Sequence, residues 1–154
     1  MSRVSKKVGK KNKATRRIRV SNSSSVAVFQ KEITIIFLEM LMMIKLFHWK
    51  TTSYATHKAT DDLYTKLNAN IDSFIEILLG KSGSRIELMN NKTIRLADLN
   101  STETLKREID RFNNYLVSLN DNAAMKRVTN NDLFNIRDTI LGDMNQFLYL
   151  LTFK

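Results

Sequence analysis

Hydrophobic side chains recur at helical spacing in four segments of the chain, and this pattern predicts four helices. The first, residues 27–50, is apolar on most of its circumference, so we expect it to pack against several neighbours in a bundle or at a subunit interface. The other three, residues 54–79, 101–120 and 131–152, each have one apolar face. These faces contain Leu63, Leu67, Ile71, Phe74, Ile75 and Leu78; Leu105, Ile109, Phe112, Leu116 and Leu119; and Leu133, Ile136, Ile140, Leu141, Met144, Leu148 and Leu151.

The lengths of the links between these segments predict how the helices are connected. Thr51, Thr52 and Ser53 form a tight turn and are good N-caps, so the first two helices should be antiparallel. We expect Gly80 to end the second helix and an Asn100 to Glu103 capping box to begin the third. The link over residues 80–100, with a short helical piece possible near residues 94–99, is long enough to run back along a helix of about 40 Å. An all-α, ferritin-like four-helix bundle with a long crossover between helices 2 and 3 is therefore predicted.

The composition supports this prediction. The 154 residues include no Pro, no Cys and four Gly, which argues against sandwiches, barrels and disulfide scaffolds, and also against thiolate metal sites. The absence of Cys is compatible with a reducing compartment. Glu39, Lys45 and His48 interrupt the apolar stretch of the first helix, so we do not expect a membrane span.

The positive charge is concentrated at the N-terminus. Residues 1–20 hold nine of the chain's 25 basic residues and no acidic residue, so they carry most of the formal net charge of +10. Residues 1–25, which end in a Ser-rich hinge, are predicted to be a disordered basic tail, and residues 26–154 the bundle. The tail should attract nucleic acid or another polyanion, while a nuclear-import signal or an organellar presequence remains an alternative. Its basic residues are Arg3, Lys6, Lys7, Lys10, Lys11, Lys13, Arg16, Arg17 and Arg19.

Candidate metal ligands gather around the first turn and along the second helix. His48 and His57 are the only two histidines, and Asp61 follows His57 by four residues. Asp72 and Glu76 are also four apart, and lie on the same helix face as the first pair. Imidazole and carboxylate groups suit a divalent metal such as iron, zinc or manganese. Taken alone, such pairs are also common on solvated helix surfaces.

The two groups of ligands are too far apart to share one metal within a chain. Eleven residues separate Asp61 from Asp72, which is about 16 Å along a helix. A second copy, packed antiparallel about a two-fold axis, would bring Asp72 and Glu76 of one chain to the histidines of the other. The sequence therefore predicts a homo-oligomer with two identical shared sites.

The order His48-Trp49, His57, Asp61, Asp72 and Glu76 resembles the signature of the Dps proteins, the small ferritins of starved bacteria. The resemblance covers about residues 28–153, although the gap between the two histidines is shorter than usual by about one helical turn. An uncharacterised family of ferritin-like proteins of large DNA viruses is also similar. The Glu-x-x-His motifs of ordinary diiron ferritins are absent.

The resemblance implies a ferroxidase that binds Fe at intersubunit sites, with two irons held by His48, His57 and Asp61 of one chain and Asp72 and Glu76 of its partner. Trp49 would lie near the site, or else in the core. Dps proteins commonly form hollow dodecamers, and many condense DNA through basic tails. The alternative is a structural virion or nucleoid protein with a vestigial metal site. Either reading places the protein inside the cell, in the cytoplasm or associated with the nucleoid or nucleus, or in a virion.

Overall fold

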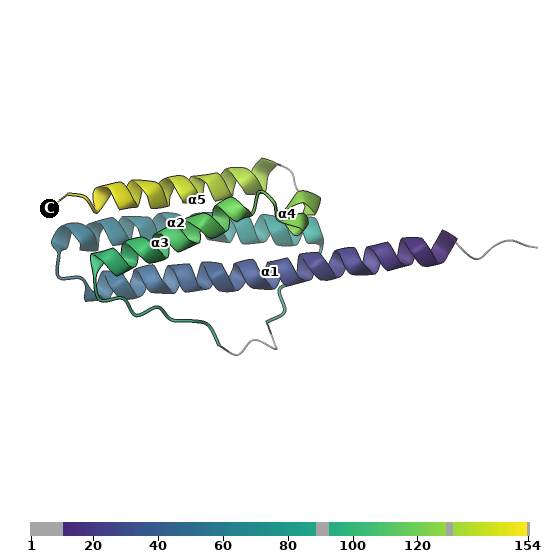
Figure 1. The fold of residues 1–154 in the computed structure, drawn as a ribbon, viewed down its shortest axis with the longest axis horizontal. Helices are drawn as coiled ribbons and strands as arrows, with labels where there is room; N and C mark the ends of the chain where they lie inside the picture. Colours follow the sequence, from purple (N-terminus) through teal and green to yellow (C-terminus); the bar gives the residue numbers. More distant parts are fainter. Residues whose placement is uncertain (1–10, 89–92, 129–130, 154) are drawn as a thin grey trace, which may run out of the picture.

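The computed structural model describes residues 11–88, 93–128 and 131–153, and within these the side chains from residue 25 onward except that of residue 128. The described part is all-helical and contains no strand. Four long helices form a bundle, and a short fifth helix joins two of them (Figure 1). The helices are α1 (Lys11–Lys50), α2 (Tyr54–Ser82), α3 (Thr102–Ser118), α4 (Ala123–Val128) and α5 (Asn131–Leu150). The all-α bundle predicted from the apolar spacing is confirmed.

The helix directions follow from the link lengths. α1 and α2 are antiparallel across the turn at residues 51–53, and α2 packs closely against both α1 and α5. The chain then crosses back along α1, so that α3 starts beside the α1–α2 turn and runs in the same direction as α2 (Figure 1). The long crossover expected between the second and third long helices is therefore present. It forms no helix over residues 94–99.

Short polar residues and one glycine set the helix ends, some of them at positions other than those predicted. Ser53 caps α2 by accepting a hydrogen bond from the Thr56 amide. α2 continues through Gly80 and ends at Gly83, whose φ of 64° is the left-handed conformation that glycine adopts without strain. At α3 the capping box joins Ser101 and Thr104 instead of Asn100 and Glu103.

α1 begins at Lys11, so the prediction that helical structure starts near residue 27 was wrong. No Pro or Gly occurs between residues 11 and 50, and the serine run at residues 23–25 does not interrupt the helix. The N-terminal part of α1 extends beyond the end of the bundle (Figure 1). Packing against the core begins near the expected boundary, because Val26 is half-buried against the core and Phe29 is buried. Residues 1–10 lie outside the described residues.

The short helix α4 was not predicted. The side chain of Asn122 accepts hydrogen bonds from the amides of Ala124 and Met125 and so caps this helix of six residues. Both residues are buried in the core. α4 therefore closes the end of the bundle between α3 and α5.

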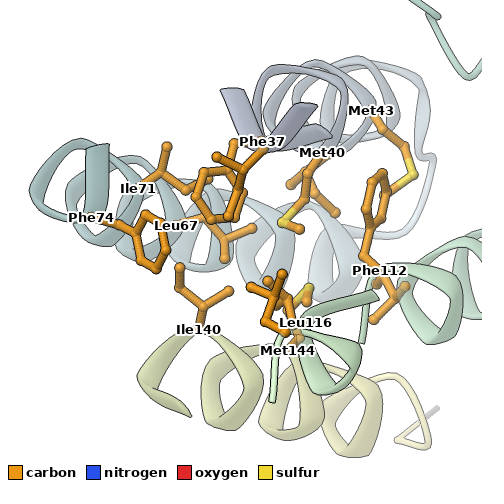
Figure 2. Packing of buried hydrophobic residues seen from close by; sticks show 14 of the residues in the cluster. Phe37, Met40, Met43, Leu67, Ile71, Phe74, Phe112, Leu116, Ile140 and Met144 are labelled. Atoms are coloured by element: carbon orange, nitrogen blue, oxygen red, sulfur yellow. The ribbon is translucent and has the colours of Figure 1, made fainter. Parts of the chain in front are cut away.

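One apolar core fills the space between the four long helices. Phe37 of α1 and Phe74 of α2 meet edge to face, with ring centroids 5.3 Å apart. Met40, Met43 and Met144 extend the same core, and all three are fully buried (Figure 2). None of the described helices is long and apolar enough to cross a membrane.

A second apolar row runs along α1 on the side away from this core, and we call it the outer stripe. Its members share one face at a spacing of three, four or seven residues and do not belong to the core cluster. They are Ile35, Leu38, Met42, Leu46 and Trp49. Ile35, Leu38 and Leu46 are half-buried, whereas Met42 and Trp49 are exposed. The outer stripe explains why the α1 sequence is apolar on most sides although a single bundle buries only one of them.

The crossover is fastened to the bundle by a cluster of charged groups. Glu39 of α1 accepts a hydrogen bond of 3.1 Å from the Arg95 amide. The Arg95 guanidinium donates to Glu108 of α3 at 2.7 Å, and Arg111 donates to the same carboxylate oxygen at 3.0 Å. At the end of α1, Lys50 donates to Asp98 and Asn100. Glu39 is thus a satisfied polar group.

This cluster predicts a dependence of stability on pH. Burial raises the pKa of Glu108, but the hydrogen bonds from Arg95 and Arg111 outweigh it and hold the pKa below its ordinary value of 4.5. The stabilisation is therefore present above about pH 4.5 and is lost as the pH falls through the lowered pKa. Glu108→Gln should lower the free energy of unfolding by up to about 1 kcal/mol at neutral pH. It should also make the free energy of unfolding fall less steeply as the pH is lowered.

Urea unfolding followed by circular dichroism between pH 3 and 7 tests this prediction. The control is Asp110→Asn, which removes an exposed carboxylate two residues later on α3. If Glu108→Gln and the wild-type protein lost stability equally as the pH is lowered, the role given to the cluster would be contradicted.

Candidate metal centre

The two histidines meet at the turn between α1 and α2. His48 lies in the last turn of α1 and His57 in the first turn of α2, and the three-residue link brings them together. Their rings stack, with centroids 3.9 Å apart and planes inclined by 25°. His48 is buried and His57 is half-buried.

Each histidine is held by the backbone of the other. His48 Nδ1 donates to the His57 carbonyl at 3.0 Å, and His57 Nδ1 donates to the His48 carbonyl at 3.1 Å. The His48 carbonyl lies in the last turn of α1, where carbonyl groups lack intrahelical partners, so the His57 ring supplies one. Because a carbonyl oxygen only accepts, both Nδ1 atoms carry the proton. In the neutral rings both Nε2 atoms therefore have a free lone pair.

A buried hydroxyl group adds a second acceptor beside His48. Thr60 is fully buried, and its Oγ1 lies 3.2 Å from His48 Nδ1. The hydroxyl can give its own hydrogen to the Thr56 carbonyl at 2.8 Å or the His57 carbonyl at 2.9 Å. Thr60 is not among the site residues predicted from the sequence. The available signal was its place as the one polar residue in the buried row of α2, ahead of Leu63 and Leu67.

Asp61 lies on the Nε2 side of His48. Its Oδ1 is 3.9 Å from His48 Nε2, and the carboxylate is about half exposed while the imidazole is buried. This distance is too long for a hydrogen bond. It is slightly shorter than the sum of two metal–ligand bonds of about 2.0–2.2 Å, so one ion could contact both atoms. The donor set of imidazole nitrogen and carboxylate oxygen thus fits a divalent transition metal.

The other two predicted ligands lie elsewhere. Asp72 and Glu76 are exposed on α2, and Glu76 lines a shallow depression with Gly80 and Arg85 near the far end of that helix. In the part of the chain that the structure describes, no three His, Asp or Glu side chains form a group that could hold a metal ion. The described part of a single chain therefore does not bring the five predicted ligands together, and the shared site remains a prediction.

Trp49 is not a core residue. Its side chain is 69% exposed, and Lys45 Nζ lies 5.9 Å from the centre of its ring. The same ammonium group lies 4.6 Å from the ring centre of Tyr64, which follows Asp61 by one turn of α2. Two aromatic rings therefore share one cation close in sequence to the candidate metal ligands. This contact was not predicted from the sequence.

The predicted nucleic-acid contacts fall outside the side chains that the structure describes. They are Arg3, Lys6, Lys7, Lys10, Lys11, Lys13, Arg16, Arg17 and Arg19. The backbone of the last five lies in α1, in its N-terminal part.

Residues 48–151 match the model of DUF5856, a family of unknown function. The chain belongs to the DUF5856 family. The matched region starts at His48, so it contains all five candidate ligands, whereas most of α1 and the basic segment of this DUF5856 protein lie outside it. No significant match was found among curated proteins or among solved structures.

Proposed function

We propose that this DUF5856 protein binds Fe(II) at sites shared between two copies of the chain and oxidises it, as the resemblance to Dps proteins implies. One observation carries the proposal: both imidazoles give their Nδ1 proton to a backbone carbonyl, and His48 directs its free Nε2 toward Asp61. Metal-binding histidines are ordinarily oriented in this way by a bond to the other ring nitrogen.

The donor atoms indicate a class of metal, and the resemblance narrows it to iron. Two imidazoles and a carboxylate suit iron, zinc and manganese. Iron is here the substrate, and two Fe(II) ions supply the two electrons that reduce one peroxide, with two protons, to two waters. His48, His57 and Asp61 would bind and orient the ion. Burial of His48 would limit access of water from the bundle side.

Two features support completion of the site by a second copy. The carboxylates of Asp72 and Glu76 are exposed, and Asp72 lies about 16 Å along α2 from Asp61. The outer stripe of α1 also leaves Met42 and Trp49 exposed. A two-fold dimer would cover such a stripe and form two equal sites. The long crossover between α2 and α3 supports a ferritin-like arrangement, and a dodecamer would follow from the resemblance.

We further propose that the basic N-terminal segment binds nucleic acid. Its nine cations are not balanced by any acid before Glu32, so they would attract a phosphate backbone without reading its sequence. Binding would then weaken strongly with salt. The protein would act inside a cell or in a virion, where nucleic acid and iron occur together.

A structural role with a vestigial metal site is the second candidate. It is favoured by the incomplete ligand group of the described residues in one chain. In this case the bundle and the basic segment would anchor a virion or nucleoid component. Oxidation chemistry would then be absent, although the histidine pair would still close the turn between α1 and α2.

Anaerobic titration with Fe(II) separates the two functions. The wild-type protein should bind iron saturably, and His57→Ala should weaken binding by at least about 100-fold, beyond the usual effect of residues that only support a ligand. Asp62→Asn is the matched control, because Asp62 is exposed beside Asp61 and is not a predicted ligand. An intact assembly that takes up no iron would contradict the first function and support the structural one.

A further inference from the structure

We infer that Thr60 is a positioning residue that determines which nitrogen of His48 faces the metal. The inference rests on the proposed function, because it assigns a role to a residue that would not touch the ion itself. It concerns the proton on the His48 ring, which can be observed without any metal.

The hydrogen bonds around Thr60 leave its oxygen available as an acceptor. A fully buried hydroxyl group needs a partner for its hydrogen, and the Thr56 and His57 carbonyls lie at 2.8 and 2.9 Å. Once the hydrogen points to one of these carbonyls, the oxygen presents its lone pairs to His48 Nδ1 at 3.2 Å. The hydroxyl therefore favours a protonated Nδ1.

The alternative tautomer would be unfavourable at this position. With the proton on Nε2, the lone pair of Nδ1 would face the His57 carbonyl oxygen at 3.0 Å and the Thr60 oxygen at 3.2 Å. The hydroxyl could then donate to the ring only by releasing its backbone carbonyl. At the same time the proton on Nε2 would occupy the position that faces Asp61 and would prevent metal binding there.

Thr60 thus adds a second acceptor to the one that the His57 carbonyl provides. The carbonyl cannot be removed by a side-chain substitution, but the hydroxyl can. Thr65, five residues later on α2, offers a comparison, because its hydroxyl also bonds back to its own helix, at 3.1 Å to the Asp61 carbonyl, and no described contact joins it to either histidine.

Three variants test the inference: Thr60→Val, which replaces the hydroxyl by a methyl group of similar size, Thr60→Ser, which restores the hydroxyl, and Thr65→Val. In metal-free protein, nitrogen NMR of the imidazoles should show His48 protonated at Nδ1 in the wild-type, Thr60→Ser and Thr65→Val proteins. Thr60→Val should show a measurable population protonated at Nε2. Its affinity for Fe(II) in an anaerobic titration should fall about 10-fold, which Thr60→Ser should reverse.

Unchanged His48 protonation and unchanged Fe(II) affinity in Thr60→Val would overturn the inference. An equal loss in Thr65→Val would also overturn it, because a general weakening of α2 would then explain the result. Thermal unfolding of each variant checks the fold, and Thr60→Ala replaces Thr60→Val if the latter does not fold. A wild-type protein that binds no Fe(II) would overturn the proposed function instead, and the NMR measurement would still decide the role of Thr60.

Discussion

Asp72→Asn combined with Glu76→Gln should abolish tight iron binding, although every imidazole ligand remains in place. The expected loss exceeds about 100-fold, because the variant removes two ligands and not a supporting contact. Both carboxylates are exposed on α2, so their replacement should leave the bundle intact. Anaerobic Fe(II) titration, with thermal unfolding as a check of the fold, gives the measurement.

A mixing experiment makes this prediction specific for a shared site. In a dimer of one His57→Ala chain and one Asp72→Asn, Glu76→Gln chain, one site has lost both halves and the other is complete. If equal amounts of the two variants are unfolded together and refolded, about half of the dimers are mixed. The mixture should therefore recover about a quarter of the wild-type iron sites, although neither variant binds iron alone.

The control for the acidic double variant is Glu103→Gln with Asp110→Asn, which removes the same charge from exposed positions of α3. Wild-type affinity in the Asp72, Glu76 variant would show that the site belongs to one chain, and the shared site would be disproved. A protein that light scattering finds to be monomeric at micromolar concentration would lead to the same conclusion.

Deletion of residues 1–20 should remove nucleic-acid binding almost completely. The deletion takes away nine cations, and the rest of the chain has nearly balanced charge. Contacts with six to ten phosphates change affinity by about 10³–10⁵-fold between low and moderate salt, so a loss of at least about 1,000-fold is expected at low salt. The fold should survive, because packing against the core begins near Val26.

Fluorescence anisotropy with a labelled DNA duplex at several salt concentrations provides the measurement. The truncated protein should bind weakly and with a much shallower dependence on salt. A variant with residues 1–20 in scrambled order is the control, and it should bind as the wild-type protein does, because the attraction depends on charge alone. Equal DNA binding by the truncated protein would refute the assignment.

The helical architecture could be predicted because its signals are local. Leu63, Leu67, Ile71 and Phe74 repeat with the period of a helix, and all four are buried on one face of α2. The helix ends were harder to predict, since Gly80 and Gly83 are equally plausible as the residue that ends α2. Only the backbone conformation at Gly83 distinguishes them. The N-terminal extent of α1 was missed because low helix propensity at the serines was taken as a break.

Of the candidate site, only the candidate metal ligands could be predicted from the sequence. His48, His57 and Asp61 are visible as residue types at suitable spacing, and the structure brings them together at one turn. The hydrogen-bond partners were not visible, because they are backbone carbonyls and the Thr60 hydroxyl. Such groups occur everywhere in a sequence, and only tertiary packing selects the ones that meet a ring. Asp72 and Glu76 are exposed on α2, and in the proposed site they would meet the histidines only across a second chain, which one protomer does not show.

The unbroken course of α1 has a mechanical consequence. Its 40 residues form a rod about 60 Å long, with His48 near one end and the basic sequence at the other. A rigid helix keeps its two ends at a fixed distance, so under the proposed function a polyanion bound at the outer end would stay well away from the proposed site of iron oxidation. Genetic material attached in this way would be kept near the protein and yet away from the reactive products of that chemistry.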